Sequence, residues 1–170
     1  IGLILNTHAH PDHCAACEIL TQNAGKTKLP LIAFSKEEYD FLRAIGEKLH
    51  GVWGLSLQKI EPFLLLGEGN LNLGKITLQV VLAPGHSPGS LCFYWPQEKT
   101  LFTGDLVFYG SIGRTDLPGG SLNALQASIE KLAELEVEYL LPGHSTEYGG
   151  FIQDQNRVKR NFQAIKMFLG

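Results

Sequence analysis

Five of the six histidines in this chain, together with two aspartates, follow apolar stretches of the sequence. The residues are His8, His10, Asp12, His13, His86, Asp105 and His144. Neutral imidazole and carboxylate groups are the side chains that borderline metals such as zinc and iron accept as ligands. A metal ion lowers the pKa of bound water to about 7, so hydroxide becomes available near neutral pH. The set therefore predicts a metal centre that hydrolyses a small substrate.

The number of candidate ligands favours two metal ions. Seven groups exceed what one tetrahedral ion needs, and they suit two ions about 3.5–4 Å apart that share one carboxylate. His8 and His10, with one residue between them, project to the same side of an extended chain. Asp12 and His13 enter the following helix and face a second point. The alternative is that these residues are structural, with Asp12 capping a helix, Asp105 in a turn and the histidines in the core.

The candidate ligands can meet only if strands position them together. They follow four apolar runs, and in three of these a glycine (Gly85, Gly104 or Gly143) directly precedes the candidate ligand. A glycine there lets the backbone turn sharply and directs the next side chain off the strand end. Open α/β sheets build their sites at strand ends, so convergence is expected.

The order of expected elements predicts a mixed α/β architecture. Strands are expected at residues 3–7, 31–34, 71–73, 76–82, 90–95, 100–103 and 139–141. Helices are expected at residues 12–23, 35–49, 121–135 and 152–168, the first stopped by Gly25 and the third capped by Ser121. Ser35 and Glu38 have the spacing of a capping box, in which the serine bonds the amide three residues on and the glutamate reaches back. Residues 50–66 are expected to be irregular.

Composition indicates one globular domain over residues 1–170. Apolar residues make up 44% and charged residues 18%, and the net charge of −3 gives no general attraction for nucleic acid. No apolar run has the length of a membrane span, and no stretch resembles a signal sequence. Three cysteines cannot all pair, which favours a reducing cytoplasm. The chain opens at Ile1 inside an apparent buried strand, so residues upstream are expected to be missing.

Four segments resemble the motifs of the metallo-β-lactamase superfamily. They are Thr-His-Ala-His-Pro-Asp-His at residues 7–13, Pro-Gly-His-Ser-Pro-Gly-Ser at 84–90, Thr-Gly-Asp at 103–105 and Pro-Gly-His at 142–144. The resemblance implies an αββα sandwich that lacks its first strands. It also implies a first metal held by His8, His10 and His86, a second held by Asp12, His13 and His144, and a bridging Asp105. Zinc is the expected metal, with iron or manganese as alternatives.

Within the superfamily, the ligand pattern narrows the expected activity. The true β-lactamases lack an aspartate at the place of Asp105, and flavodiiron proteins carry a glutamate at the place of His10. Residues 111–120 are similar to a segment of glyoxalase II-like thioesterases and their persulfide dioxygenase relatives. The resemblance implies a dinuclear hydrolase of a small ester or thioester, similar to hydroxyacylglutathione hydrolase. The alternatives are an iron-dependent persulfide dioxygenase, in which Asp12 and His144 would be spare, and a catalytically incomplete metal-binding fragment.

The sequence departs from the family pattern in three ways. Without the first strands, one sheet has an exposed edge, which favours a homo-oligomer formed through that edge. Ala16 stands where the family usually has glycine, and alanine is still small enough for close helix packing. The C-terminal helical domain that supplies glutathione contacts in glyoxalase II is also missing, so glutathione itself is in doubt. No nucleic-acid or membrane partner is expected, only a small-molecule substrate.

Several further residues have alternative roles. Asp12 and Asp105 are expected to act in catalysis, with Asp12 relaying a proton. Arg114 and Tyr148 are candidates for substrate binding, although Arg114 could instead pair with Asp116 to shape a loop. Cys14 and Cys17 could form a redox pair or bind metal, but small residues there more often allow a helix to pack closely. His50 and Trp53 could line a pocket, while a lone histidine at that position is more often exposed.

Overall fold

The computed structural model describes residues 1–22, 30–55 and 60–169. Its helices are α1 (Pro11–Cys14), α2 (Ala16–Gln22), α3 (Lys36–Val52), the short 3-10 helix η1 (Pro96–Glu98), α4 (Leu122–Ala133) and α5 (Gln155–Leu169). Its strands are β1 (Leu3–Leu5), β2 (Leu31–Ser35), β3 (Leu64–Leu66), β4 (Gly69–Leu73), β5 (Ile76–Leu82), β6 (Leu91–Trp95), β7 (Thr100–Gly104), β8 (Val107–Phe108), β9 (Ser111–Ile112), β10 (Tyr139–Pro142) and β11 (Ile152–Gln153).

The first sheet is small and parallel. Its strands lie in the order β1-β2-β3, with helices in the connections. Successive residues of a strand point to opposite faces, so β2 contributes to two cores. Phe34 packs with Cys14, Cys17 and Leu42 on the helical side. Ala33 packs on the other side, against residues of the second sheet.

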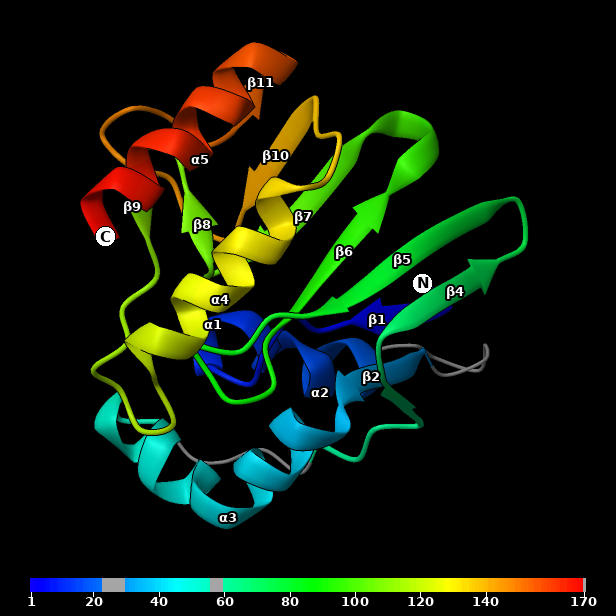
Figure 1. Cartoon of the computed structure of the whole chain (residues 1–170). Coiled ribbons are helices and arrows are strands. Elements are labelled where there is room, and N and C mark those ends of the chain that lie inside the picture. Colours follow the sequence, from blue (N-terminus) through cyan, green and yellow to red (C-terminus); the bar gives the residue numbers. More distant parts are fainter. Residues whose placement is uncertain (23–29, 56–59, 170) are drawn as a thin grey trace.

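The second sheet has six strands in the order β11-β10-β7-β6-β5-β4. In β6, Phe93 faces the first sheet, whereas Cys92 faces a core built with α4 and α5. The two helices lie along the outer face of this sheet, and α3 lies beyond the first sheet (Figure 1). The layers are therefore helix, sheet, sheet and helix, which confirms the predicted αββα architecture.

Three of the sequence predictions about the elements were wrong in detail. Residues 50–66 are not wholly irregular, because α3 continues to Val52 and 64–66 form β3; residues 56–59 lie outside the described part. The single helix predicted for residues 12–23 is broken at Ala15 into α1 and α2. The predicted end of that helix, at Asn23 and Gly25, falls outside the described residues. The last helix begins at 155 because residues 152–153 pair with β10 as β11.

The predicted capping box is only half formed. Ser35 Oγ accepts a hydrogen bond from the Glu38 amide at 3.0 Å, as expected of an N-cap. Glu38 does not reach back to the Ser35 amide. Ser35 still belongs to β2 and pairs with Leu66 of β3, and the Glu38 carboxylate hydrogen-bonds to other loops.

β1 lies at one edge of the three-stranded sheet. The expectation that this edge pairs with another chain stays a prediction, as does the assignment of residues 1–170 to one domain. Among the helices of the described residues, none has the length and apolar character needed to cross a membrane.

Candidate metal centre

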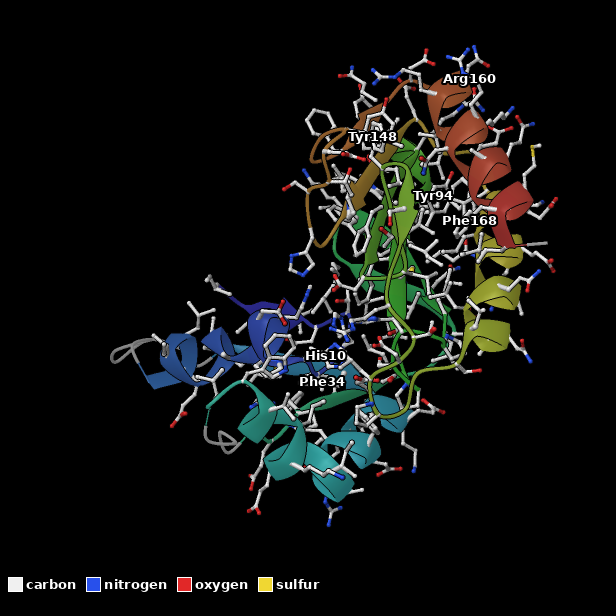
Figure 2. All side chains as sticks on the ribbon, turned by 90° about the vertical axis from the view of Figure 1, so that its left-hand side faces the viewer. His10, Phe34, Tyr94, Tyr148, Arg160 and Phe168 are labelled. Carbon is white, nitrogen blue, oxygen red and sulfur yellow. The ribbon has the colours of Figure 1, made fainter. Side chains whose placement is uncertain are left out.

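Four strands deliver the candidate ligands to one place. β5, β7 and β10 run in the same direction, because β6 is antiparallel to β5 and β7 while β10 is parallel to β7. His86, Asp105 and His144 follow the carboxyl ends of these three strands. β1 from the first sheet ends at the same place, where the Thr7 carbonyl accepts a hydrogen bond from the Leu91 amide at 2.8 Å. Figure 2 shows His10 at this junction of the two sheets.

A first group of ligand atoms is buried. It consists of His8, His10 and His86, whose ligand nitrogens all lie within 4.8 Å of one another. His10 Nδ1 and His86 Nε2 are 2.8 Å apart. The three residues are at most 3% exposed, so the group lies at the bottom of the site.

A second group lies nearer the surface and contains Asp12, His13 and His144. His13 Nε2 and His144 Nε2 are 3.1 Å apart, and His144 Nε2 is 3.2 Å from Asp12 Oδ2. Asp105 lies between the groups. Its Oδ2 is 3.6 Å from His86 Nε2 and 3.2 Å from His144 Nε2, and its Oδ1 is 3.2 Å from His13 Nε2.

The spacing of these atoms fits metal coordination. Ligands at about 2.0–2.1 Å from a tetrahedral ion lie roughly 3.3 Å from one another. The nitrogen and oxygen pairs within each group, at 2.8, 3.1 and 3.2 Å, are close to that edge length. The buried Nε2 atom of His8 has no hydrogen-bond partner among the described residues. Since a buried polar atom without a partner is costly, this nitrogen fits the role of a metal ligand.

One histidine is held in the tautomer that a ligand needs. His86 Nδ1 lies 2.8 Å from the Arg114 carbonyl, so Nδ1 carries the proton and Nε2 presents a lone pair to the cluster. His8 Nδ1 is 3.0 Å from Thr7 Oγ1, a contact that holds the ring with Nε2 directed at the cluster.

The electrostatic environment keeps the first group neutral. Burial, followed by the neighbouring His86, lowers the pKa of His10 to about 4. Burial is also the main cause that lowers the pKa of His8 and of His86. Burial acts in the same direction on His13, but the hydrogen bond and charge of Asp105 outweigh it and raise the His13 pKa. Neutral imidazole is the form that binds a metal, so the first group is prepared for an ion at pH 7.

The predicted glycines are needed for the close approach of the ligands. A Cβ on Gly143 would lie 2.2 Å from Asp105 Oδ1 and 2.7 Å from His13 Cε1. Gly104 has a φ of +52°, and a Cβ there would lie 2.7 Å from Thr7 Oγ1. Side chains at Gly143 and Gly104 would push apart the strand ends that carry the ligands. Gly85 has a φ of +143°, and a Cβ there would lie 2.3 Å from the Cα of Leu125, so this glycine lets α4 pack beside His86.

A cleft of about 460 Å³ opens above the cluster. Besides His10, Asp12, His86, Asp105 and His144, it is lined by Trp53, Phe108, Ile112, Gly113, Arg114, Leu117, Ser145 and Thr146. Arg114 forms two hydrogen bonds of 2.7 Å with Asp116, which is the pairing considered from the sequence. Sequence reasoning missed the apolar walls Phe108, Ile112 and Leu117, because no local pattern distinguishes a cleft wall from a core residue.

Tyr148, His50 and Trp53, which the sequence also suggested as candidates, differ in their position relative to the cleft. Tyr148 packs on Tyr109 with ring centroids 5.7 Å apart, and it lies away from His10 (Figure 2). It does not line the cleft described above, so its role in substrate binding stays a prediction. His50 is buried at 1% exposure, contrary to the expectation of an exposed histidine, because it lies on the inner side of an α3 that continues past it. Trp53 lines the cleft, as considered.

The three cysteines are buried and free. Burial raises the pKa of Cys14 to about 12, and it also raises that of Cys17. A reactive thiol needs the opposite shift, so the structure favours the packing role of this pair over the redox role. Cys92 is likewise part of the core.

Comparison with known proteins agrees with the fold. A family model described as the metallo-beta-lactamase superfamily matches residues 1–144. The chain is 36% identical over 163 residues to the probable metallo-hydrolase YqgX of Bacillus subtilis, an alignment that covers 94% of this chain and 76% of YqgX. It is 34% identical over 154 residues to the hydroxyacylglutathione hydrolase GloC of Haemophilus influenzae, with 86% and 69% covered.

A solved structure agrees as well. TTHA1623 in a di-iron-bound form is 36% identical and superposes with a TM-score of 0.73, over 85% of this chain and 70% of that one. The match to the family model extends over most of the chain and includes all the segments that carry the candidate ligands. The chain belongs to the metallo-β-lactamase superfamily.

Proposed function

We propose that the protein is a dinuclear metal-dependent hydrolase that cleaves a small thioester or ester. The observation that carries this proposal is the placement of Asp105 between two groups of ligand atoms, each with three members. In the proposal, His8, His10 and His86 hold one ion, and Asp12, His13 and His144 hold the other. Zinc is the proposed metal, and the di-iron form of TTHA1623 makes iron the main competitor.

The bound ions would supply Lewis acidity and a water of lowered pKa, which is the chemistry that hydrolysis at neutral pH requires. The chain's own residues would orient the metal ligands and transfer a proton. The Arg114 carbonyl and Thr7 hydroxyl fix the imidazoles of His86 and His8. Asp12 is 54% exposed in its side chain and borders the cleft, so the carboxylate oxygen that does not bind the ion is placed to take up and return a proton.

The cleft supports a small and largely apolar acyl substrate. Trp53, Phe108, Ile112 and Leu117 provide apolar walls beside the ligand cluster. The Arg114 guanidinium is already paired with Asp116, so it is poorly placed to recognise a second carboxylate. GloC, whose name describes an acylated thiol as substrate, is among the similar proteins and supports a thioester.

One observation weighs against the dioxygenase alternative. A mononuclear iron site would leave Asp12 and His144 spare, but here Asp12 Oδ2 lies 3.2 Å from His144 Nε2 and Asp105 lies beside them. The gathering of these two residues beside the bridging candidate supports a second metal site.

The test combines metal analysis with two assays on the purified protein. We expect two metal ions per chain by elemental analysis, and zinc-dependent cleavage of short acyl thioesters without oxygen uptake. One iron per chain with oxygen uptake on a persulfide would establish the alternative instead. Two bound ions with no turnover on any ester or thioester would indicate the catalytically incomplete form.

A further inference from the structure

Glu38 is a fully buried carboxylate that the proposed chemistry does not use. It lies in the first turn of α3 and has no exposed surface. Its Oε1 accepts a hydrogen bond from the Ala9 amide at 2.9 Å. Its Oε2 accepts hydrogen bonds from the Gly89 amide at 2.8 Å and from Ser87 Oγ at 2.7 Å.

The partners of Glu38 lie next to candidate metal ligands on two different loops. Ala9 stands between His8 and His10, in the segment that follows β1 of the first sheet. Ser87 and Gly89 follow His86 in the loop between β5 and β6 of the second sheet. One carboxylate therefore joins the two loops that carry all three members of the first ligand group.

The surrounding contacts make this junction tight. Ser35 Oγ donates to the Gly89 carbonyl at 2.6 Å, and a Cβ on Gly89 would lie 2.2 Å from the Glu38 amide nitrogen. Ser87 Oγ also lies 2.6 Å from Ser90 Oγ. The loop after His86 thus rests directly on the start of α3.

Both backbone partners are obligate donors, so both Glu38 oxygens must accept. An amide in place of the carboxylate has one oxygen and one NH2 group, and the NH2 group cannot accept a hydrogen bond from a backbone N–H. A glutamine can therefore satisfy one loop, but it places two donors against each other at the other loop. A buried, unsatisfied donor of this kind is costly, so the loop would have to shift.

We propose that Glu38 is a positioning residue that fixes the separation of the His8–His10 segment from His86, and so forms the first metal site. This inference rests on the proposed function, since it assumes that these histidines bind an ion. Burial raises the pKa of Glu38, while hydrogen bonds from Ser87, Ala9 and Gly89 oppose the rise. The three donors around the two oxygens match the ionised form.

The test compares Glu38→Gln with Glu37→Gln, which removes the same charge from the exposed neighbour on the same helix. Metal-free proteins are titrated with Co²⁺ and followed by visible absorption, with His86→Ala and His144→Ala as references for loss of the first and second sites. We expect Glu38→Gln to weaken the first site roughly 10–100-fold, the effect typical of residues that orient metal ligands, and to leave the second within about 3-fold. Glu37→Gln should match the wild type.

The outcomes separate the inference from the function on which it rests. If the wild type binds no Co²⁺ at either site, the proposed function fails. If the wild type binds two ions and Glu38→Gln does too with unchanged affinities, or with both sites weakened equally, only the positioning role fails. Should Glu38→Gln not fold, Ser87→Ala removes one hydrogen bond on the His86 side. Ser87→Ala should weaken Co²⁺ binding at the first site and leave the second site unchanged. Affinities equal to those of the wild type at both sites would overturn the inference.

Discussion

Asp105 is the residue at which the two ligand groups meet. Its two oxygens lie within 3.6 Å of nitrogens from His13, His86 and His144. Burial raises its pKa, but the hydrogen bond and charge of His13 and the other histidines outweigh burial and lower it. The group is thus a carboxylate at neutral pH, as a bridging ligand must be.

Asp105→Ala should therefore abolish the dinuclear site. We expect metal content to fall from two ions per chain to one or fewer, and turnover to fall by about 100-fold or more, since a ligand is lost rather than only its orientation. Elemental analysis and a thioester assay measure both. Asp116→Ala, which removes a carboxylate bound to Arg114 outside the cluster, is the control and should retain two ions. Full metal occupancy in Asp105→Ala would contradict the bridging role.

The neutral histidines of the first group predict acid sensitivity of the metal-free protein. The folded-state pKa of His10 is about 4, and those of His8 and His86 are also lowered from 6.5. Between these pKa values and pH 6.5, the unfolded chain binds more protons than the folded chain does. The free energy of unfolding therefore falls as pH falls. The raised pKa of His13 makes the free energy of unfolding depend on pH mainly above this window, because below pH 6.5 the imidazole is protonated in both the folded and the unfolded state.

We expect urea unfolding of the EDTA-treated protein to show a loss of at least about 1 kcal/mol per pH unit between pH 6 and 4.5. His10→Asn should flatten this slope, because it removes one of the depressed groups. A wild-type stability that is flat across the window would show that the buried imidazoles accept protons without cost.

Residue types and spacing were enough to find the seven candidate ligands, because each follows an apolar strand and three follow a glycine. Glu38 could not be found in this way. Its sequence context suggested a capping box, and only the packing of the loop after His86 against α3 shows that its carboxylate joins two loops. The same holds for Trp53, whose place in the cleft depends on where α3 ends.

At the scale of elements, the strand ends determine how closely the ligands approach. The turn after β10 illustrates this, because Gly143 lies so close to Asp105 that a methyl group would overlap its carboxylate. Gly143→Ala should displace Asp105 or His144, lower metal occupancy of the second site and reduce turnover by roughly 10–100-fold. The overpacking should also cost about 1–3 kcal/mol of stability.

Gly150→Ala is the matched control for this variant, because its nearest contact would be an ordinary 3.8 Å to Ser145 Cβ. It should retain metal and activity. Metal titration and chemical unfolding of both variants measure the difference. An unaffected second site in Gly143→Ala would mean that the turn relaxes without moving the ligands.

Elements with a strong apolar periodicity were predicted well, whereas short elements with weak periodicity were missed. The buried strands β5, β6 and β7 and the helices α4 and α5 have clear apolar periodicity. β3 is three leucines without alternation, and β11 is two residues whose pairing with β10 is a tertiary contact. Such short elements exist because a neighbouring strand is available, which is information that a local sequence does not contain.

At the scale of the whole molecule, the ligand cluster lies where the two sheets meet. His8, His10, Asp12 and His13 follow β1 of the first sheet, whereas the remaining candidates follow strands of the second. Protein contacts already join these ends, through the Thr7 carbonyl with the Leu91 amide and through Glu38. Metal ions bound by both sets would add links between the sheets.

Removing the metal should therefore destabilise the protein and loosen both sheets together. An ion present at a hundred times its dissociation constant adds about 2.7 kcal/mol to the folded state. For a chain of this size, that corresponds to a rise of roughly 5–10 °C in Tm, since each kcal/mol shifts Tm by about 2–4 °C. Calorimetry with zinc and with EDTA measures the shift.

Hydrogen exchange then decides whether the ions join the two sheets. With metal bound, we expect slower exchange of amides in β1 and β2 and also in β5, β6 and β7. Any ion that binds only the folded state raises Tm, so the calorimetric shift alone does not test the link. If the added protection is confined to one sheet, then the ligands from the other sheet are not engaged, and the two-sheet arrangement of the metal centre is wrong.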